Sequence, residues 1–164
     1  MRAKETRHVM ERNMRKILKP ILLVLAVILA PIAASADGHG EKDMRLFVNL
    51  TTDDTWAAAK AIMFAHQKAQ KQGYDAAIWL NVRAVYLADK KRPSHVHGLM
   101  AENGTSIQDM LAAFIADGGT VIMCGACTKA AGLSKDSYID GIVMGNTELV
   151  AGWLFDPNTK TLAW

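Results

Sequence analysis

The chain has 164 residues, 51% of them hydrophobic, and a formal net charge of +3 at pH 7. The positive balance comes from the first 36 residues, because residues 37–164 hold 12 basic and 14 acidic residues, a net charge of −2. This excludes the compositional argument for nucleic-acid binding, which needs a basic face. The 128 residues from 37 onward suffice for one domain with a single core and are too few for two.

Residues 1–36 have the three-part pattern of a secretory signal peptide. A basic flank precedes an apolar stretch at residues 21–30, and a small-residue cleavage pattern ends at Ala36. Because the apolar stretch is shorter than the roughly 20 residues of a membrane-spanning helix, we expect cleavage near Ala36 and no stable span afterwards. The expected location is therefore the periplasm or another exported compartment, with a retained anchor as the alternative. Met1 and Met14 both fit as the start.

Residues 37–43 are polar and predict a flexible leader. The domain expected at residues 44–164 alternates apolar runs with amphipathic stretches. The predicted strands are residues 44–50, 76–82, 120–123, 142–144 and 160–164. The predicted helices are residues 55–72, 107–116, 124–132 and 147–154. Residues 83–104 lack a clean period and predict a long irregular loop, of a kind that is often functional. The fold class is therefore α/β, a single layered domain with a mainly parallel sheet of four or five strands flanked by helices.

Candidate site residues follow the predicted strands, because ligands collect at the carboxyl ends of parallel strands. Asn49, Thr51 and Asp53 follow the first strand and are candidate substrate contacts, although Asp53 also fits the start of the helix after it. The long loop after the second strand contributes His95 and His97, which are either solvated or ligands of a bound group.

Cys124 and Cys127 follow the third strand and carry the strongest chemical signal. A cysteine in the first turn of a helix faces unpaired N–H groups, which favour the thiolate and so raise nucleophilicity. The spacing also brings Cys127 within one turn of Cys124, so a disulfide or a resolving role is open. A structural disulfide over so short a gap would constrain the unfolded chain little.

Metal binding at this cysteine pair is the less favoured alternative. A closed zinc site needs four ligands, and no second cysteine pair exists, so we expect no metal centre and no cofactor. A soft copper-type site combining the cysteines with His95 and His97 stays open. The basic run at residues 90–92 predicts a solvated face that could also attract an anionic sulfur species.

The segment VIMCGACTKAAGL at residues 121–133 resembles the region around the active cysteine of DsrE-like proteins, the DsrE/DsrF and TusD group. The resemblance extends over nearly all of residues 44–164. It implies a parallel α/β sheet, assembly as a homo-trimer or homo-hexamer, and sulfurtransferase activity through a cysteine persulfide. It assigns the persulfide to Cys124, eight residues before Gly132, and matches Cys127 to a cysteine that some members have. The chain departs from many members at Ala131, where they have arginine, and in its expected export.

Three functions follow from these observations. The first is an exported sulfur carrier that holds sulfane sulfur on Cys124 and exchanges it with a donor or acceptor protein or a small sulfane-sulfur species, with Cys127 as the resolving or partner thiol. The second is a periplasmic dithiol/disulfide oxidoreductase, although the pair sits late in the chain, after a third strand and without a preceding tryptophan. The third is a non-catalytic binding or metal-binding module.

Overall fold

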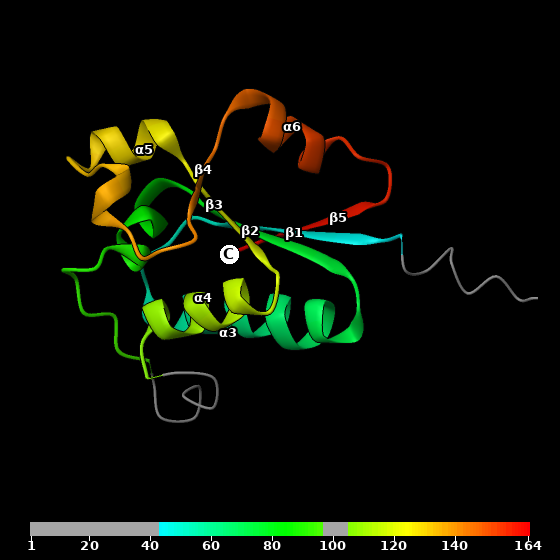
Figure 1. Cartoon of the computed structure of the whole chain (residues 1–164), viewed down its shortest axis with the longest axis horizontal. Coiled ribbons are helices and arrows are strands. Elements are labelled where there is room, and N and C mark those ends of the chain that lie inside the picture. The colour runs from blue at the N-terminus through cyan, green and yellow to red at the C-terminus, as the bar shows by residue number, and fades with distance from the viewer. Residues whose placement is uncertain (1–42, 97–104) are drawn as a thin grey trace, which may run out of the picture. The chain divides into compact units, whose positions relative to one another are not determined.

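The computed structural model describes residues 43–96 and 105–164. In this part of the chain five strands form one sheet in the order β4-β3-β2-β1-β5 (Figure 1), and every neighbouring pair is parallel. The strands are β1 (Arg45–Leu50), β2 (Asp75–Leu80), β3 (Thr120–Met123), β4 (Val143–Met144) and β5 (Thr159–Ala163). The predicted α/β class with a parallel sheet is confirmed.

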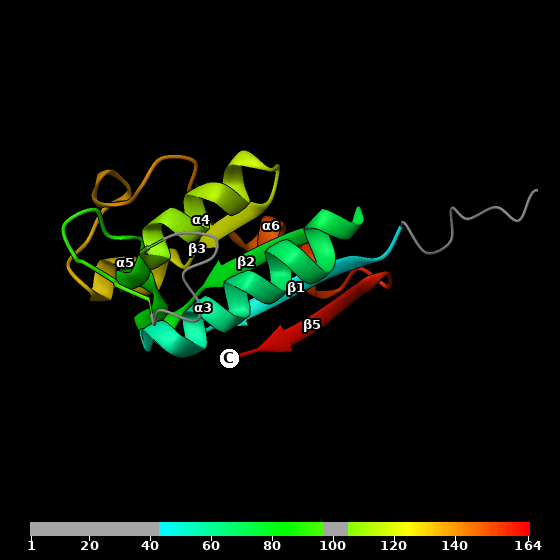
Figure 2. The same ribbon diagram turned by 90° about the horizontal axis from the view of Figure 1, so that it is seen from below.

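Helices cover the two faces of this sheet unequally. The α-helices are α3 (Thr55–Met63), α4 (Ile107–Ala116), α5 (Gly125–Ala130) and α6 (Thr147–Leu154). Figure 1 shows α3 and α4 against one face and α6 against the other, and Figure 2 shows α3 and α4 side by side. Because β1 to β4 run outward in chain order, α6 must carry the chain back across the opposite face to place β5 beside β1.

Strand alternation divides the hydrophobic interior into two clusters. In β1, Leu46, Val48 and Leu50 face α3 and α4 and join the larger cluster. Phe47 points to the other face and joins the smaller cluster with Trp153 of α6. Both faces of the sheet are therefore packed, as expected for a parallel sheet.

The predicted helix at residues 55–72 is helical throughout but changes type along its length. It is α-helical up to Met63, continues as the π-helix η1 (Phe64–Ala69), and ends as the 3₁₀-helix η2 (Gln70–Gln72). Gly73 follows with φ 91°, a left-handed conformation that glycine adopts without steric cost. The predicted helix end at residue 72 is confirmed.

The prediction of strand up to residue 82 and of irregular structure from residue 83 was wrong. Strand β2 ends at Leu80, and the 3₁₀-helix η3 (Val82–Ala88) begins after Asn81, which caps it. The apolar residues of η3 recur at helical spacing and are buried; they are Ala84, Val85, Leu87 and Ala88. This short period was hidden because the exposed Arg83 and the half-buried Tyr86 interrupt it. Part of the predicted loop, residues 97–104, lies outside the described residues.

The helix predicted at residues 107–116 is confirmed as α4. Ser106 and Asp109 form a reciprocal capping box at its start, which satisfies two of the free N–H groups there. No helix within residues 43–96 and 105–164 is long and apolar enough to cross a membrane. The expected signal peptide and nearly all of the expected leader lie outside the described residues.

Candidate functional site

Cys124 is the N-cap of α5, at the carboxyl end of β3. Its Sγ accepts a hydrogen bond of 3.2 Å from the backbone N–H of Cys127. The Thr128 hydroxyl donates to the Cys124 carbonyl over 2.8 Å and also shares a hydrogen bond with the buried hydroxyl of Tyr138. These contacts attach the first turn of α5 to the core, so Cys124 is held in place by a well-packed helix start.

Cys127 contacts the loop that follows β2. Its Sγ donates a hydrogen bond of 3.2 Å to Asn81 Oδ1 and accepts one of 3.3 Å from the backbone N–H of Val82. The two cysteines are free, and both are half-buried. Cys127 thus contacts the residues that directly follow β2, Asn81 and Val82, which the sequence pattern predicts inside the second strand.

Val82 has an unusual backbone conformation for a branched side chain. Its φ is 49°, and it is the one non-glycine residue with positive φ in the described part of the chain. Such a conformation is a genuine outlier for a β-branched residue and is found preferentially at functional sites. Here it directs the Val82 N–H toward the Cys127 sulfur.

The sequence predicts that the helix start favours the thiolate of Cys124, but in the folded protein burial has the larger effect on its pKa. Burial raises the pKa of the Cys124 thiol, and the neighbouring Cys127 side chain raises it further. The backbone N–H groups of Cys127 and Ala126 act in the opposite direction but do not prevail. The resting Cys124 is therefore a protonated thiol at neutral pH, held beside the donors that would stabilise its charged form.

Asp53 belongs to an ion-pair cluster with Arg92 and with Arg83, the residue directly after Val82. Its carboxylate accepts two hydrogen bonds from Arg83, of 3.0 and 2.8 Å, and one of 2.8 Å from Arg92. The Arg83 guanidinium, followed by that of Arg92, holds the pKa of Asp53 well below its usual range despite partial desolvation. The helix cap predicted around these acids is the next residue, Asp54, which accepts from the N–H of Ala57.

Asn49 and Thr51, like Asp53, take no part in the hydrogen bonds of the cysteine side chains among the described residues. The Thr51 hydroxyl and N–H both donate to the carbonyl of Trp164, so Thr51 fastens the end of the chain. Asn49 is half-buried, and its Oδ1 has no hydrogen-bond partner among the described residues. His95 is exposed and forms a backbone bridge with Ser106. His97 lies outside the described residues.

The basic run at residues 90–92 is not a purely solvated face. Arg92 pairs with Asp53, as described above, and Lys90 Nζ lies 3.3 Å from the carboxylate of Asp140. Within residues 43–96 and 105–164, no cluster of histidine, cysteine and acidic side chains could hold a metal ion.

A cleft of about 320 Å³ opens beside Cys124 on the α6 side of the sheet. Trp79 and Val150 form an apolar wall, and the first turns of α5 and α6, at Gly125 and Thr147, line the rest. The Trp79 Nε1–H is buried without a hydrogen-bond partner among the described residues. Cys124 therefore borders the larger core on one side and an accessible cleft on the other.

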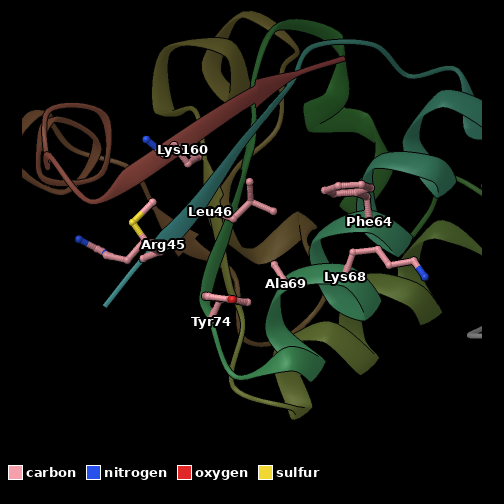
Figure 3. Close-up of a pocket in the computed structure, with 8 residues that line it drawn as sticks. Arg45, Leu46, Phe64, Lys68, Ala69, Tyr74 and Lys160 are labelled. Carbon is pink, nitrogen blue, oxygen red and sulfur yellow. The ribbon is translucent and has the colours of Figure 1, made fainter. Parts of the chain in front are cut away.

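A second hollow, of about 310 Å³, lies at the opposite end of the sheet. Figure 3 shows Leu46, Phe64, Ala69 and Tyr74 around it. Lys68 and Lys160 lie at its edge, with their side chains directed away from one another in this view. None of the candidate site residues lines this hollow, so it is separate from the cysteine site.

The family model of the DsrE/DsrF-like proteins matches residues 44–156. The chain belongs to the DsrE/DsrF-like family. This match covers every strand from β1 to β4 and both cysteines, and it confirms the family that the segment around Cys124 indicates.

A solved structure has the same fold as this DsrE/DsrF-like chain. It is the crystal structure of the ychN protein from E. coli, with a TM-score of 0.59 and 21% sequence identity. The alignment covers 74% of this chain and 99% of the ychN chain. At this identity the likeness shows the fold alone. No match was found among curated proteins.

Sequence reasoning missed Asn81, Val82 and Trp79 as site residues. The rule that pointed to the ends of the first and third strands applies equally to the second, where Asn81 directly follows β2. Because the predicted second strand extended to residue 82, Asn81 was assigned to the sheet and not to the loop at its carboxyl end. Nothing in the sequence indicates the left-handed conformation of Val82.

Proposed function

We propose that this DsrE/DsrF-like protein is a sulfur carrier that holds sulfane sulfur as a persulfide on Cys124. The observation that carries the proposal is the position of Cys124, which caps α5 and lines an accessible cleft, with a second thiol in the first turn of that helix. Backbone donors at this helix start can stabilise the negative charge that develops on sulfur during exchange.

Loading and unloading are two sulfur exchanges at Cys124. In loading, the Cys124 thiolate attacks the terminal sulfur of a polysulfide; a new S–S bond forms, the old one breaks, and the shortened polysulfide leaves with the electron pair. In unloading, the thiolate of an acceptor attacks the outer sulfur of the persulfide and Cys124 leaves as thiolate. Loading needs the Cys124 thiolate, so we expect it to accelerate as pH rises toward the raised pKa of Cys124, whereas unloading needs the thiolate of the acceptor.

Cyanide chemistry tests the carrier function. The reduced protein is incubated with polysulfide, freed of small molecules, and treated with cyanide, which removes a sulfane sulfur as thiocyanate. We expect close to one equivalent of thiocyanate per chain from the unmodified protein and none from Cys124→Ser. Thiocyanate formation that persists in Cys124→Ser would place the sulfur elsewhere and contradict the proposal.

A dithiol/disulfide oxidoreductase is the second candidate. It is favoured by the contact between the two thiols, through which the Cys127 side chain raises the pKa of Cys124. Such a protein would cycle between the dithiol and a Cys124–Cys127 disulfide, and it would reduce a disulfide substrate only when both cysteines are present. The variant Cys127→Ser distinguishes the two functions. A carrier without Cys127 still takes up sulfur on Cys124, whereas an oxidoreductase without Cys127 no longer reduces its disulfide substrate.

We propose export on the basis of residues 1–36. The test is expression of the chain in a bacterial host, with fractionation of the cells and sequencing of the protein's amino terminus. We expect an extracytoplasmic product that begins at Asp37, and a cytoplasmic product when residues 2–36 are deleted. An uncleaved product in the membrane fraction would instead indicate a retained anchor.

The partners proposed are a sulfur donor, a sulfur acceptor and further copies of this chain. The family resemblance supports a trimer or hexamer, and large apolar side chains are exposed at the end of α6, where Phe155 is 82% and Leu154 is 37% exposed. Light scattering of the purified protein would measure the assembly directly, with a monomer contradicting this part of the proposal.

A further inference from the structure

A single atom of Asn81, its side-chain oxygen Oδ1, contacts both Cys127 and the backbone of Val82. This oxygen accepts from Cys127 Sγ over 3.2 Å and from the Val82 N–H over 2.9 Å. The Val82 N–H is at the same time 3.3 Å from the Cys127 sulfur. Asn81, Val82 and Cys127 therefore form a closed triangle of hydrogen bonds next to the proposed carrier cysteine.

The amide of Asn81 has one orientation in this triangle. The Val82 N–H can only donate, so it requires the oxygen of the Asn81 amide rather than the nitrogen. The same oxygen then meets Cys127, which must present its S–H to it. This hydrogen bond exists only while Cys127 keeps its proton.

The turn that presents Asn81 is fixed to two neighbouring strand ends. The Asn81 N–H donates to the Leu50 carbonyl over 2.9 Å, and the Arg83 N–H donates to the Thr51 carbonyl over 3.2 Å. The Arg83 side chain is tied to Asp53 by two hydrogen bonds. The backbone of Asn81 is thus held at a set position by contacts that do not involve Cys127.

We propose that Asn81 is a positioning residue that restrains Cys127 and so controls how long the persulfide survives on Cys124. The proposal rests on the proposed carrier function. Resolution requires the Cys127 thiolate to attack the inner sulfur of the Cys124 persulfide. The Cys124–Cys127 disulfide forms, the S–S bond of the persulfide breaks, and the outer sulfur leaves as hydrosulfide, which takes up the proton released by Cys127. Because only the thiolate attacks, the hydrogen bond to Asn81 must break first.

Two substitutions of Asn81 separate this role from a structural one. In Asn81→Ala the restraint is gone while the Val82 N–H still faces the sulfur, so we expect sulfide release from the loaded protein to accelerate about fivefold, the factor for one hydrogen bond of about 1 kcal/mol. In Asn81→Asp the side-chain oxygen that caps η3 is kept and a negative charge faces the sulfur, so release should be as slow as in the unmodified protein or slower. A purely structural role would shift both variants in the same direction.

The measurement is a time course with the purified, reduced protein and polysulfide. Mass spectrometry follows loading, a sulfide-selective probe follows release, and Cys127→Ser is the control in which release by this route is absent. The initial rate of loading should be the same in both Asn81 variants, because Asn81 does not contact Cys124. Equal release rates in the unmodified protein and in both Asn81 variants would overturn the inference.

A second arm does not depend on persulfide. Oxidised glutathione forms a mixed disulfide with Cys124, and attack by Cys127 then closes the Cys124–Cys127 disulfide and releases glutathione thiolate. If Asn81→Ala accelerates this closure although polysulfide never loads the protein, the proposed function fails and the role of Asn81 stands. If polysulfide loads but closure is unchanged by both substitutions, the role of Asn81 fails alone.

Discussion

The backbone N–H of Val82 donates to the sulfur of Cys127 over 3.3 Å, from a residue whose φ is 49°. This contact joins the end of β2 to the first turn after β3, two loops that are 45 residues apart in the chain. A strained residue at this point shows that the geometry around the cysteine is held against a local conformational cost.

Replacing Val82 by glycine tests the strain directly. The Val82 side chain is 56% exposed, so little packing is lost, and glycine removes a left-handed conformational cost of roughly 1–2 kcal/mol. The greater flexibility of glycine in the unfolded chain offsets part of this gain. We expect the free energy of unfolding in urea to stay within about 1 kcal/mol of the unmodified protein. The fully buried Val85 is the control, where alanine should cost about 2 kcal/mol.

The smaller core under α6 depends on Phe47. Its ring is fully buried and stacks on Trp79 and Trp153, with ring centroids 6.1 and 6.0 Å away. We expect Phe47→Ala to lower the free energy of unfolding by about 3–5 kcal/mol. Lys60→Ala is the control, because this side chain is exposed on α3, and its cost should stay within about 0.5 kcal/mol. Similar costs in the two variants would show that the ring stack is not a core.

The Asp53 cluster predicts a dependence of stability on acid pH. Pairing with Arg83 and Arg92 depresses the pKa of Asp53 in the folded protein, so its contribution is fully present above the unfolded value of about 4 and is lost as pH falls below it. Urea unfolding between pH 7 and pH 2 should therefore show a steeper acid loss in the unmodified protein than in Asp53→Asn. Parallel pH profiles would contradict this assignment.

The raised pKa of Cys124 predicts its alkylation profile. Because iodoacetamide reacts with the thiolate, the rate at Cys124 should keep rising at pH values where an unperturbed cysteine in a peptide has already levelled off. Peptide mapping after short pulses of reagent measures this rate for Cys124 separately from Cys127. A rate that levels off near neutral pH would show that the helix start outweighs burial.

The sequence was sufficient to predict the sheet class and the position of Cys124, because apolar runs, capping residues and the small-residue helix after the cysteine are local signals. It was insufficient for Asn81 and Val82, whose roles arise from a contact between two loops and from a strained backbone conformation. The sequence also could not show whether burial or the helix start has the larger effect on the pKa of Cys124. That balance depends on what packs around the sulfur, and burial prevails.

The most direct test of the account is intact-mass spectrometry of the reduced protein after incubation with polysulfide, beside Cys124→Ser and Cys127→Ser. A persulfide on Cys124 predicts a gain of about 32 Da, one sulfur atom, in the unmodified protein and in Cys127→Ser, and no gain in Cys124→Ser, because loading requires the thiolate of that cysteine. Loss of two hydrogens in the unmodified protein, together with no gain of sulfur in Cys127→Ser, which cannot form the disulfide, would contradict the carrier function and favour the dithiol oxidoreductase.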